Sequence, residues 1–190
     1  MTKKYIIYPE RNNYSMRQYE EYINQLVQQQ KDEVFYNSGP DHAAAVMSAI
    51  FNSGNRYIKI YAGELDKRVS KQRHYENSLE SFLRKDGVTL KIILQRYNKE
   101  EEPEIFDLLR YYNLLDPAKI EIKTHNFRVA RGLETGEVHF TVADDRMYRV
   151  EDDVINFTAE GNFNDAKRSL ELSHLFDQMF CSPKIVAVSL

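Results

Sequence analysis

The sequence predicts an α/β fold with a central mixed β-sheet and helices on both faces. Two observations predict it. Strand-like apolar segments alternate with segments of helical spacing in the first half, which is typical of parallel strands joined by helices. Strand candidates with short connections follow in the second half, which favours hairpins added to the same sheet. The 190 residues contain no linker-like tract, so we expect one domain with a sizeable core.

The first half of the chain carries the predicted strand–helix units. Residues 57–61 (YIKIY) predict a strand, and residues 88–94 (VTLKIIL) predict a strand buried on both faces because the apolar run barely alternates. Residues 1–40 belong either to the domain itself, which then spans 1–190, or to an N-terminal extension. The remaining predicted elements are helices at 19–30, 43–50, 75–83 and 105–112 and strands at 3–9, 33–36 and 119–124.

The second half carries the hairpin candidates and a last helix. Helical spacing begins after Asn164 and continues to Phe180. The apolar residues 184–190 fit either a final strand or a tail that binds a partner. Strands are predicted at 137–144, 147–150 and 154–158, the first two joined across Asp144-Asp145-Arg146.

Composition excludes several classes of function. A net charge of −3 gives no global basic field to gather nucleic acid. The single cysteine, Cys181, excludes an intramolecular disulfide framework and a cysteine-based zinc site, and it fits a reducing cytosol. No apolar run has the length needed to span a membrane. We therefore expect a cytoplasmic protein with no membrane association, no cofactor and no metal.

Two segments supply the candidate site. The alternation of residues 137–144 places Glu137, His139 and Thr141 on one strand face, opposite the apolar core face. The segment Gly161-Asn162-Phe163-Asn164 predicts a tight turn at the start of a helix. A carboxylate and an imidazole beside such a turn predict an anion site, with His139 and Glu137 as catalytic candidates and Asn162, Asn164 and Thr141 as phosphate-binding candidates.

Each of these residues also has a purely structural interpretation. His139 fits a buried histidine that is hydrogen-bonded to Glu137 or Asn164. Asn164 fits an N-cap of the last helix, with Asp165 placed favourably for the helix dipole. A metal held by Glu137 and His139 across a dimer would have two ligands from each chain, which is too few to predict a metal site.

Residues 40–180 resemble one half of the phospholipase D superfamily, specifically its small single-motif, nuclease-like members. The resemblance rests on a helix that leads into the strand at 57–61 and on a second helix that leads through Asp86-Gly87-Val88 into the next strand. It also rests on the Gly161–Asn164 segment, which matches the Gly-Ser-x-Asn turn of the family with Asn in place of Ser. The resemblance implies a phospholipase D-like half and a homodimer, because such members pair two chains to build one active site.

The family signature His-x-Lys-x(4)-Asp is degenerate here. One register keeps Asp144 at the aspartate, which puts His139 at the lysine position and Glu137 at the nucleophilic histidine. The other register puts His139 at the nucleophile and Thr141 at the lysine, but Arg146 then falls at the aspartate. We prefer the first register because it retains Asp144.

The changes bear on the chemistry that the resemblance implies. In the family a histidine of one half attacks phosphorus, the histidine of the other half protonates the leaving oxygen, and lysines and asparagines hold the phosphate oxygens. Glu137 at the nucleophile position would repel an anionic phosphodiester, and no lysine offsets that repulsion.

Two hypotheses for function follow. The first is a non-catalytic, dimeric binding or scaffold module in a nucleic-acid-linked process, such as a mobile-element or defence system, with a protein partner and nucleic acid as further candidates. The second is a divergent phosphodiesterase or nuclease that uses His139 across a dimer. An inhibitor that binds a host protein through its surface is a third interpretation, which no specific residue supports.

Overall fold

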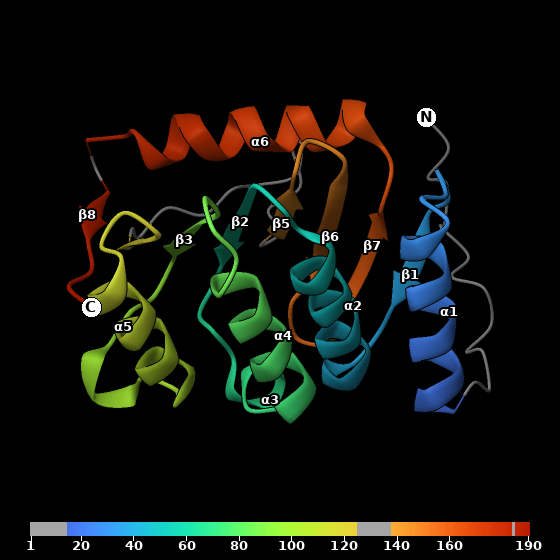
Figure 1. Ribbon diagram of the computed structural model, residues 1–190, viewed down its shortest axis with the longest axis horizontal. Coiled ribbons are helices and arrows are strands. Elements are labelled where there is room, and N and C mark those ends of the chain that lie inside the picture. Colours follow the sequence, from blue (N-terminus) through green and yellow to red (C-terminus); the bar gives the residue numbers. More distant parts are fainter. Residues whose placement is uncertain (1–14, 125–137, 184) are drawn as a thin grey trace.

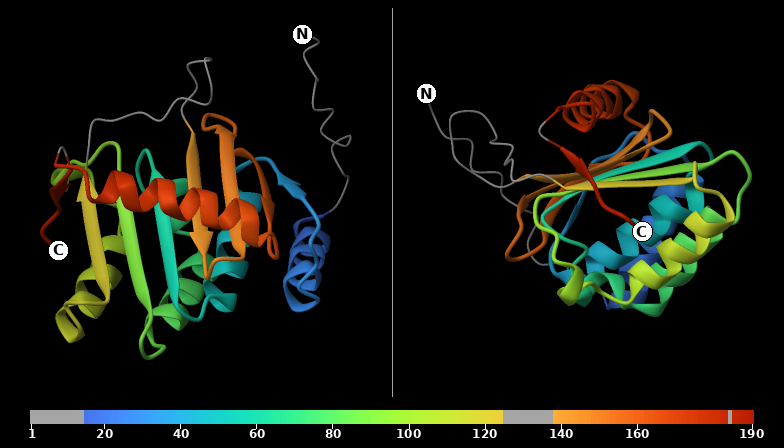
Figure 2. Two further views of the ribbon diagram at one scale, coloured as in Figure 1. Left: turned by 90° about the horizontal axis from the view of Figure 1, so that it is seen from above. Right: turned by 90° about the vertical axis from the view of Figure 1, so that its left-hand side faces the viewer.

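The computed structural model describes residues 15–124, 138–183 and 185–190, and its centre is one eight-stranded sheet. The strand order is β1-β7-β6-β5-β2-β3-β4-β8. Helices α1 to α5 cover one face of the sheet and α6 runs across the other (Figures 1 and 2). This arrangement confirms the predicted α/β class, the mixed sheet and the placement of helices on both faces.

The directions of the strands follow from their connections. Strands β2, β3 and β4 are parallel because a helix separates each from the next, whereas β5, β6 and β7 form antiparallel hairpins. Strand β5 also pairs antiparallel with β2, which joins the two halves into one sheet. The bounds are β1 Phe35–Asn37, β2 Tyr57–Ala62, β3 Thr89–Leu94, β4 Ile120–Thr124, β5 His139–Ala143, β6 Met147–Asp153, β7 Thr158–Asn162 and β8 Val186–Ala187.

The helices lie close to the positions that apolar spacing predicts. Tyr19, Ile23 and Leu26 of the first helix are buried, and this helix packs on the second. No helix in the described ranges combines the length and apolar character that a membrane crossing requires. The bounds are α1 Met16–Gln28, α2 Pro40–Ser53, α3 Lys67–Ser70, α4 Arg73–Leu83, the 3-10 helix η1 Lys99–Glu101, α5 Ile105–Leu115 and α6 Ala166–Phe180.

Two apolar clusters hold the layers together, one on each face of the sheet. The larger lies under α1 to α5 and the smaller under α6. In the smaller cluster Phe176 of α6 meets Phe140 of β5 edge-on and stacks on Phe180. Each fully buried aromatic or aliphatic side chain of this kind stabilises the fold by roughly 1.5–3 kcal/mol.

One predicted strand is displaced along the chain. The prediction for 154–158 is wrong for residues 154–157, which form a turn, and β7 begins at Thr158. The carboxylate of Asp153 accepts the backbone N–H groups of Ile155 and Asn156 at 3.1 Å, and Phe157 adopts a φ of 54°. A carboxylate that bonds the backbone two and three residues ahead favours a turn over a sheet ladder. The strand predicted at 3–9 lies outside the described residues.

Gly161 also differs from its prediction, because it lies inside β7 and not in a turn. A Cβ atom there would lie 2.4 Å from Cζ of Phe35 and 2.7 Å from the carbonyl oxygen of Tyr148. Glycine is therefore required at this position by the close approach of the Phe35 ring. The turn residues proper are Phe163 and Asn164, which follow the strand.

The hairpin between β5 and β6 is fixed by two adjacent aspartates. Asp144 and Asp145 adopt φ values of 55° and 58°, which match the type I′ turn of a two-residue hairpin loop. The carboxylate of Asp144 accepts the backbone N–H groups of Asn55, Arg56 and Tyr57 at 2.7, 2.9 and 3.1 Å. Asp144 thus anchors the start of β2 to the hairpin.

Candidate functional site

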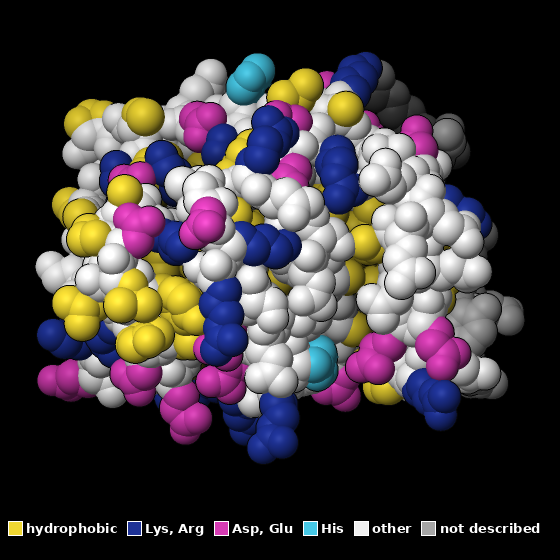
Figure 3. Space-filling model, in the orientation of Figure 1, with side chains coloured by type: hydrophobic (Ala, Val, Ile, Leu, Met, Phe, Trp, Pro, Cys, Tyr) yellow, Lys and Arg dark blue, Asp and Glu magenta, His cyan; other side chains and the backbone are white. Residues whose placement is uncertain are grey.

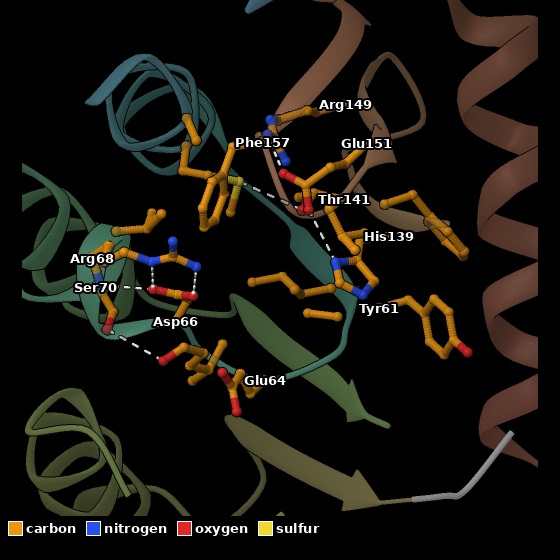
Figure 4. A pocket seen from close by; sticks show the side chains of 18 of the residues that line it. Tyr61, Glu64, Asp66, Arg68, Ser70, His139, Thr141, Arg149, Glu151 and Phe157 are labelled. Atoms are coloured by element: carbon orange, nitrogen blue, oxygen red, sulfur yellow. Dashed lines mark hydrogen bonds and ion pairs between the residues drawn. The ribbon is translucent and has the colours of Figure 1, made fainter. Parts of the chain in front are cut away.

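The candidate site is a cavity of about 360 Å³ at the edge of the sheet where β2 and β3 end and β5 begins (Figure 4). The carboxyl ends of the parallel strands meet here, which is where ligands bind in open α/β sheets. His139, Thr141, Arg149 and Glu151 line one wall from β5 and β6. The opposite wall comes from the segment after β2, which includes α3.

A chain of hydrogen bonds runs from His139 across three strands. Nδ1 of His139 lies 2.9 Å from Oε2 of Glu151, which is its direct partner in the β5–β6 register. Arg149 donates from Nη2 to Oε1 of Glu151 at 2.7 Å and from Nε to Oδ1 of Asn37 at 3.1 Å. The guanidinium reaches Asn37 of β1 because the intervening strand carries the small residue Ala159 opposite Glu151.

The carboxylate of Glu151 stays ionised although it is buried. Burial alone would raise the pKa of Glu151, but the hydrogen bond from His139 and the charge of Arg149 outweigh it and hold the pKa below its ordinary value. Because a carboxylate only accepts hydrogen bonds, the proton shared with His139 belongs to Nδ1. Nε2 is then the nitrogen left for a ligand.

Nε2 of His139 is buried and has no hydrogen-bond partner among the described residues. Gly63, just after β2, and Arg96, just after β3, lie near it. A Cβ atom at Gly63 would lie 3.0 Å from this Nε2 and 3.3 Å from Nη2 of Arg96. The absence of a side chain at Gly63 therefore lets the imidazole and the guanidinium approach the same point.

The guanidinium groups around the cavity differ in whether they have partners. Arg68 pairs with Asp66 at 2.7 Å and lies over the Phe157 ring, and Arg149 pairs with Glu151. Arg96 is exposed and makes no side-chain hydrogen bond or ion pair within the described part of the chain. It is therefore the guanidinium of this cavity that is ready to bind an anion.

A second cavity of about 600 Å³ lies next to the first along the same edge. The two share Arg96, Arg68 and the segment from Glu64 to Asp66. The far wall of the second cavity is formed by Tyr97, the loop that contains η1, and Phe106 of α5. Arg96 therefore lies at the boundary between the two cavities.

The structure brings together two of the candidate residues from the sequence and separates two others. His139 and Thr141 both line the first cavity, and the Thr141 hydroxyl donates to Sδ of Met47 at 3.5 Å. Glu137 lies outside the described residues. Asn162 and Asn164 do not line this cavity.

Asn162 and Asn164 hold the chain between α1 and β1. Asn162 donates to Asp32 at 2.8 Å and accepts from the backbone N–H of Asn164, while Asn164 donates to the carbonyl oxygen of Gln30. Asn162 pairs with Tyr148, three positions along β6 from the partner of His139. At about 3.4 Å for each residue, that separates Asn162 from His139 by roughly 10 Å along the strands.

The N-cap of α6 is Asp165 and not Asn164. The carboxylate of Asp165 accepts a hydrogen bond from the backbone N–H of Arg168.

Several residues of this site have no role in the sequence-based prediction. Arg96 follows an apolar strand, and only the fold places it beside His139. A sequence signal for Arg149 and Glu151 does exist, because these opposite charges alternate with apolar residues, but the strand predicted at 147–150 ends one residue before Glu151. Within the described residues, no group of three or more His, Cys, Asp or Glu side chains is placed to hold a metal ion.

Comparisons with known proteins place the fold. No family model matches the chain, and no curated protein matches its sequence. Many solved structures match it, among them two that align over most of its length. TrmBL2, an archaeal chromatin protein reported to bind DNA in a novel mode, is 14% identical with a TM-score of 0.50, covering 85% of this chain and 58% of its own. Phosphatidylserine synthase of Haemophilus influenzae Rd KW20 is 13% identical with a TM-score of 0.51, covering 82% and 39%.

These similarities concern the fold alone, because both identities are low. The chain spans less than two thirds of the length of either structure. The synthase belongs to the phospholipase D superfamily, so its match agrees with the resemblance drawn from the sequence. Over most of its length the chain shares the α/β fold of these two structures.

Proposed function

We propose that this chain is a phospholipase D-like domain that binds a phosphate ester beside His139 and acts as a binding module, not as a phosphodiesterase. The observation that carries the proposal is the unpaired guanidinium of Arg96 next to the buried imidazole of His139. An arginine that lacks a carboxylate partner at the carboxyl ends of parallel strands is well suited to bind a phosphate oxygen.

The burial of Nε2 of His139 favours a binding function over a catalytic one. A nucleophilic imidazole needs an open path from Nε2 to phosphorus, with the reacting atoms about 3–3.5 Å apart. In this structure Nε2 has essentially no exposed surface. A ligand that rests on Arg96 needs no access to Nε2.

One observation favours the alternative of a divergent phosphodiesterase. The carboxylate of Glu151 holds Nδ1 of His139, and this hydrogen bond orients Nε2. Such a dyad could act on a phosphodiester only if Nε2 became accessible when substrate bound. Under this alternative, His139→Ala abolishes cleavage of a phosphodiester while the fold persists.

Binding of inorganic phosphate at constant ionic strength tests the proposal. We expect Arg96→Gln to weaken binding by about tenfold, which corresponds to the loss of roughly 1.4 kcal/mol from one charge-assisted contact. Gly63→Ala also weakens it, because a Cβ there crowds both His139 and Arg96. The matched control is Arg17→Gln, which removes an exposed arginine of α1 that lies outside both cavities.

The result also separates binding from catalysis. Equal binding by the wild type and Arg96→Gln would overturn the proposed site. Cleavage of DNA, RNA or a generic phosphodiester by the wild type, lost in His139→Ala, would replace the binding module with the phosphodiesterase alternative. Glu137 as its general base and the cytoplasmic location remain predictions.

The homodimer and the nucleic-acid-linked or defence setting also belong to this proposal. Three exposed large apolar residues of α5 support this part of the proposal, namely Tyr111, Leu114 and Leu115, because such a group suits contact with a second copy or another protein. Figure 3 shows hydrophobic side chains gathered over α5, at the lower left of the view. Sedimentation of the wild type and of Leu114→Lys tests whether this surface mediates self-association.

A further inference from the structure

The two cavities at this sheet edge have different charge environments. The first has three carboxylates, three guanidinium groups and the imidazole of His139. The second has four carboxylates against three cations. An anion is therefore stabilised better in the first cavity, and a group that donates hydrogen bonds is stabilised better in the second. The charged residues of the second cavity are Glu64, Asp66, Glu101, Glu102, Lys67, Arg68 and Arg96.

The far wall of the second cavity is held in place by its own contacts. The hydroxyl of Tyr97 donates to Glu102, and Arg110 pairs with the same carboxylate. The side chain of Asn98 accepts the backbone N–H of Glu100 at 3.1 Å. These bonds fix the loop after β3 in one conformation, so the cavity is formed before any ligand arrives.

Glu101 is the acidic residue of this wall that keeps free acceptors. Its side chain makes no hydrogen bond or ion pair within the described part of the chain, whereas Glu102 is engaged by Tyr97 and Arg110. The ring of Tyr97 lies on the same wall, where it offers an aromatic surface. A free carboxylate beside an aromatic ring recognises an amino group on a flat or small organic moiety.

We infer that the ligand is a phosphate ester whose organic part carries an amino group. Its phosphate lies against Arg96 in the first cavity, and its amino group donates to Glu101 in the second. This inference rests on the proposed function and adds the class of ligand to it. The amino group belongs either to a nucleobase or to an alkylammonium group, and the same acceptor serves both.

Two matched pairs of compounds test this assignment by titration calorimetry. Adenosine 5′-monophosphate is compared with purine riboside 5′-monophosphate, which lacks the amino group. Phosphoethanolamine is compared with ethyl phosphate. We expect the amino compound of at least one pair to bind about tenfold more tightly than its partner, the usual gain from one hydrogen bond to a charged acceptor. The pair that shows the preference identifies the source of the amino group.

The Glu101→Gln variant locates the preference. We expect it to lose the discrimination and to keep its affinity for inorganic phosphate. Glu104→Gln is the matched control, because Glu104 lies on the same loop and lines neither cavity. Circular dichroism checks that both variants fold.

The outcomes separate the two claims. Phosphate binding that depends on Arg96, without preference in either pair, would overturn this inference and leave the proposed function standing. A preference retained in Glu101→Gln would also overturn it. Failure of every compound to bind would overturn the proposed function, and the inference with it.

Discussion

His139 and Glu151 face each other directly across the β5–β6 hairpin, with Nδ1 of the imidazole 2.9 Å from Oε2 of the carboxylate. This pair determines which imidazole nitrogen carries the shared proton and how the ring is oriented in the cavity. It places the proton on Nδ1, leaves Nε2 beside Arg96, and joins the ring to the buried guanidinium of Arg149. A two-residue hairpin turn sets the register, so the geometry depends on the turn as much as on the two side chains.

Replacing Glu151 by Gln is expected to destabilise the fold by about 3 kcal/mol, because it leaves the buried charge of Arg149 without a counter-ion. Urea denaturation monitored by circular dichroism measures the change. Glu121→Gln is the control, since it removes a carboxylate of a largely exposed pair with Lys91 and is expected to cost less than about 1 kcal/mol. Equal effects of the two variants would contradict the role of the buried pair.

The pKa of the same carboxylate determines how the free energy of unfolding depends on pH. The pKa of Glu151 lies below its ordinary value of 4.5 in the folded state, so the folded chain binds its proton less readily than the unfolded chain. Its contribution is fully present above about pH 4.5 and is lost as the pH falls through the lower, folded pKa. Unfolding free energies measured between pH 6 and pH 3 are expected to fall less steeply in Glu151→Gln than in the wild type.

Asp144→Ala is expected to destabilise the fold by about 2–3 kcal/mol. It leaves three backbone N–H groups at the start of β2 without their acceptor and puts alanine at a φ of 55°. Asp144→Asn keeps an acceptor oxygen and tolerates the left-handed conformation, so its cost is expected to be smaller. Thermal unfolding of the two variants measures the difference. Equal midpoints would contradict the anchoring role of this carboxylate.

Gly161→Ala is expected to destabilise the fold by about 2 kcal/mol or more, because the new methyl group overlaps Phe35 and the Tyr148 carbonyl oxygen. Adding Phe35→Leu is expected to restore part of the loss, since a smaller side chain removes one of the two clashes. Denaturation of the single and double variants measures this coupling. Additive losses would show that the Phe35 contact does not require glycine at this position.

The sequence predicts the architecture well where a local pattern determines the structure. Alternation of apolar and polar residues predicts β5, and a continuous apolar run predicts β3. Burial of one face or of both faces of a strand determines which of these two patterns its sequence shows. No such hydrophobic pattern indicates the turn at residues 154–157. It depends on the hydrogen bonds of Asp153 to two backbone groups, which compete with the strand.

The candidate site was predicted less completely, because its contacts join distant parts of the chain. The sequence indicates His139 and Thr141, which share a strand face. It does not indicate Arg96, which follows β3 and lies near His139 of β5 because both strands are neighbours of β2 in the sheet. The pairing of Asn162 with Asp32 spans 130 residues, so no local pattern shows that this amide is occupied away from the cavity.

The central claim is that phosphate binds beside the imidazole of His139. A titration with inorganic phosphate, followed through the ¹⁵N-labelled imidazole signals with His139→Ala used for assignment, tests it most directly. We expect the Nε2 signal of His139 to shift along a saturable curve and the signal of His174 to stay fixed, and we expect Arg96→Gln to abolish the shift. A constant His139 signal at saturating phosphate would contradict the claim.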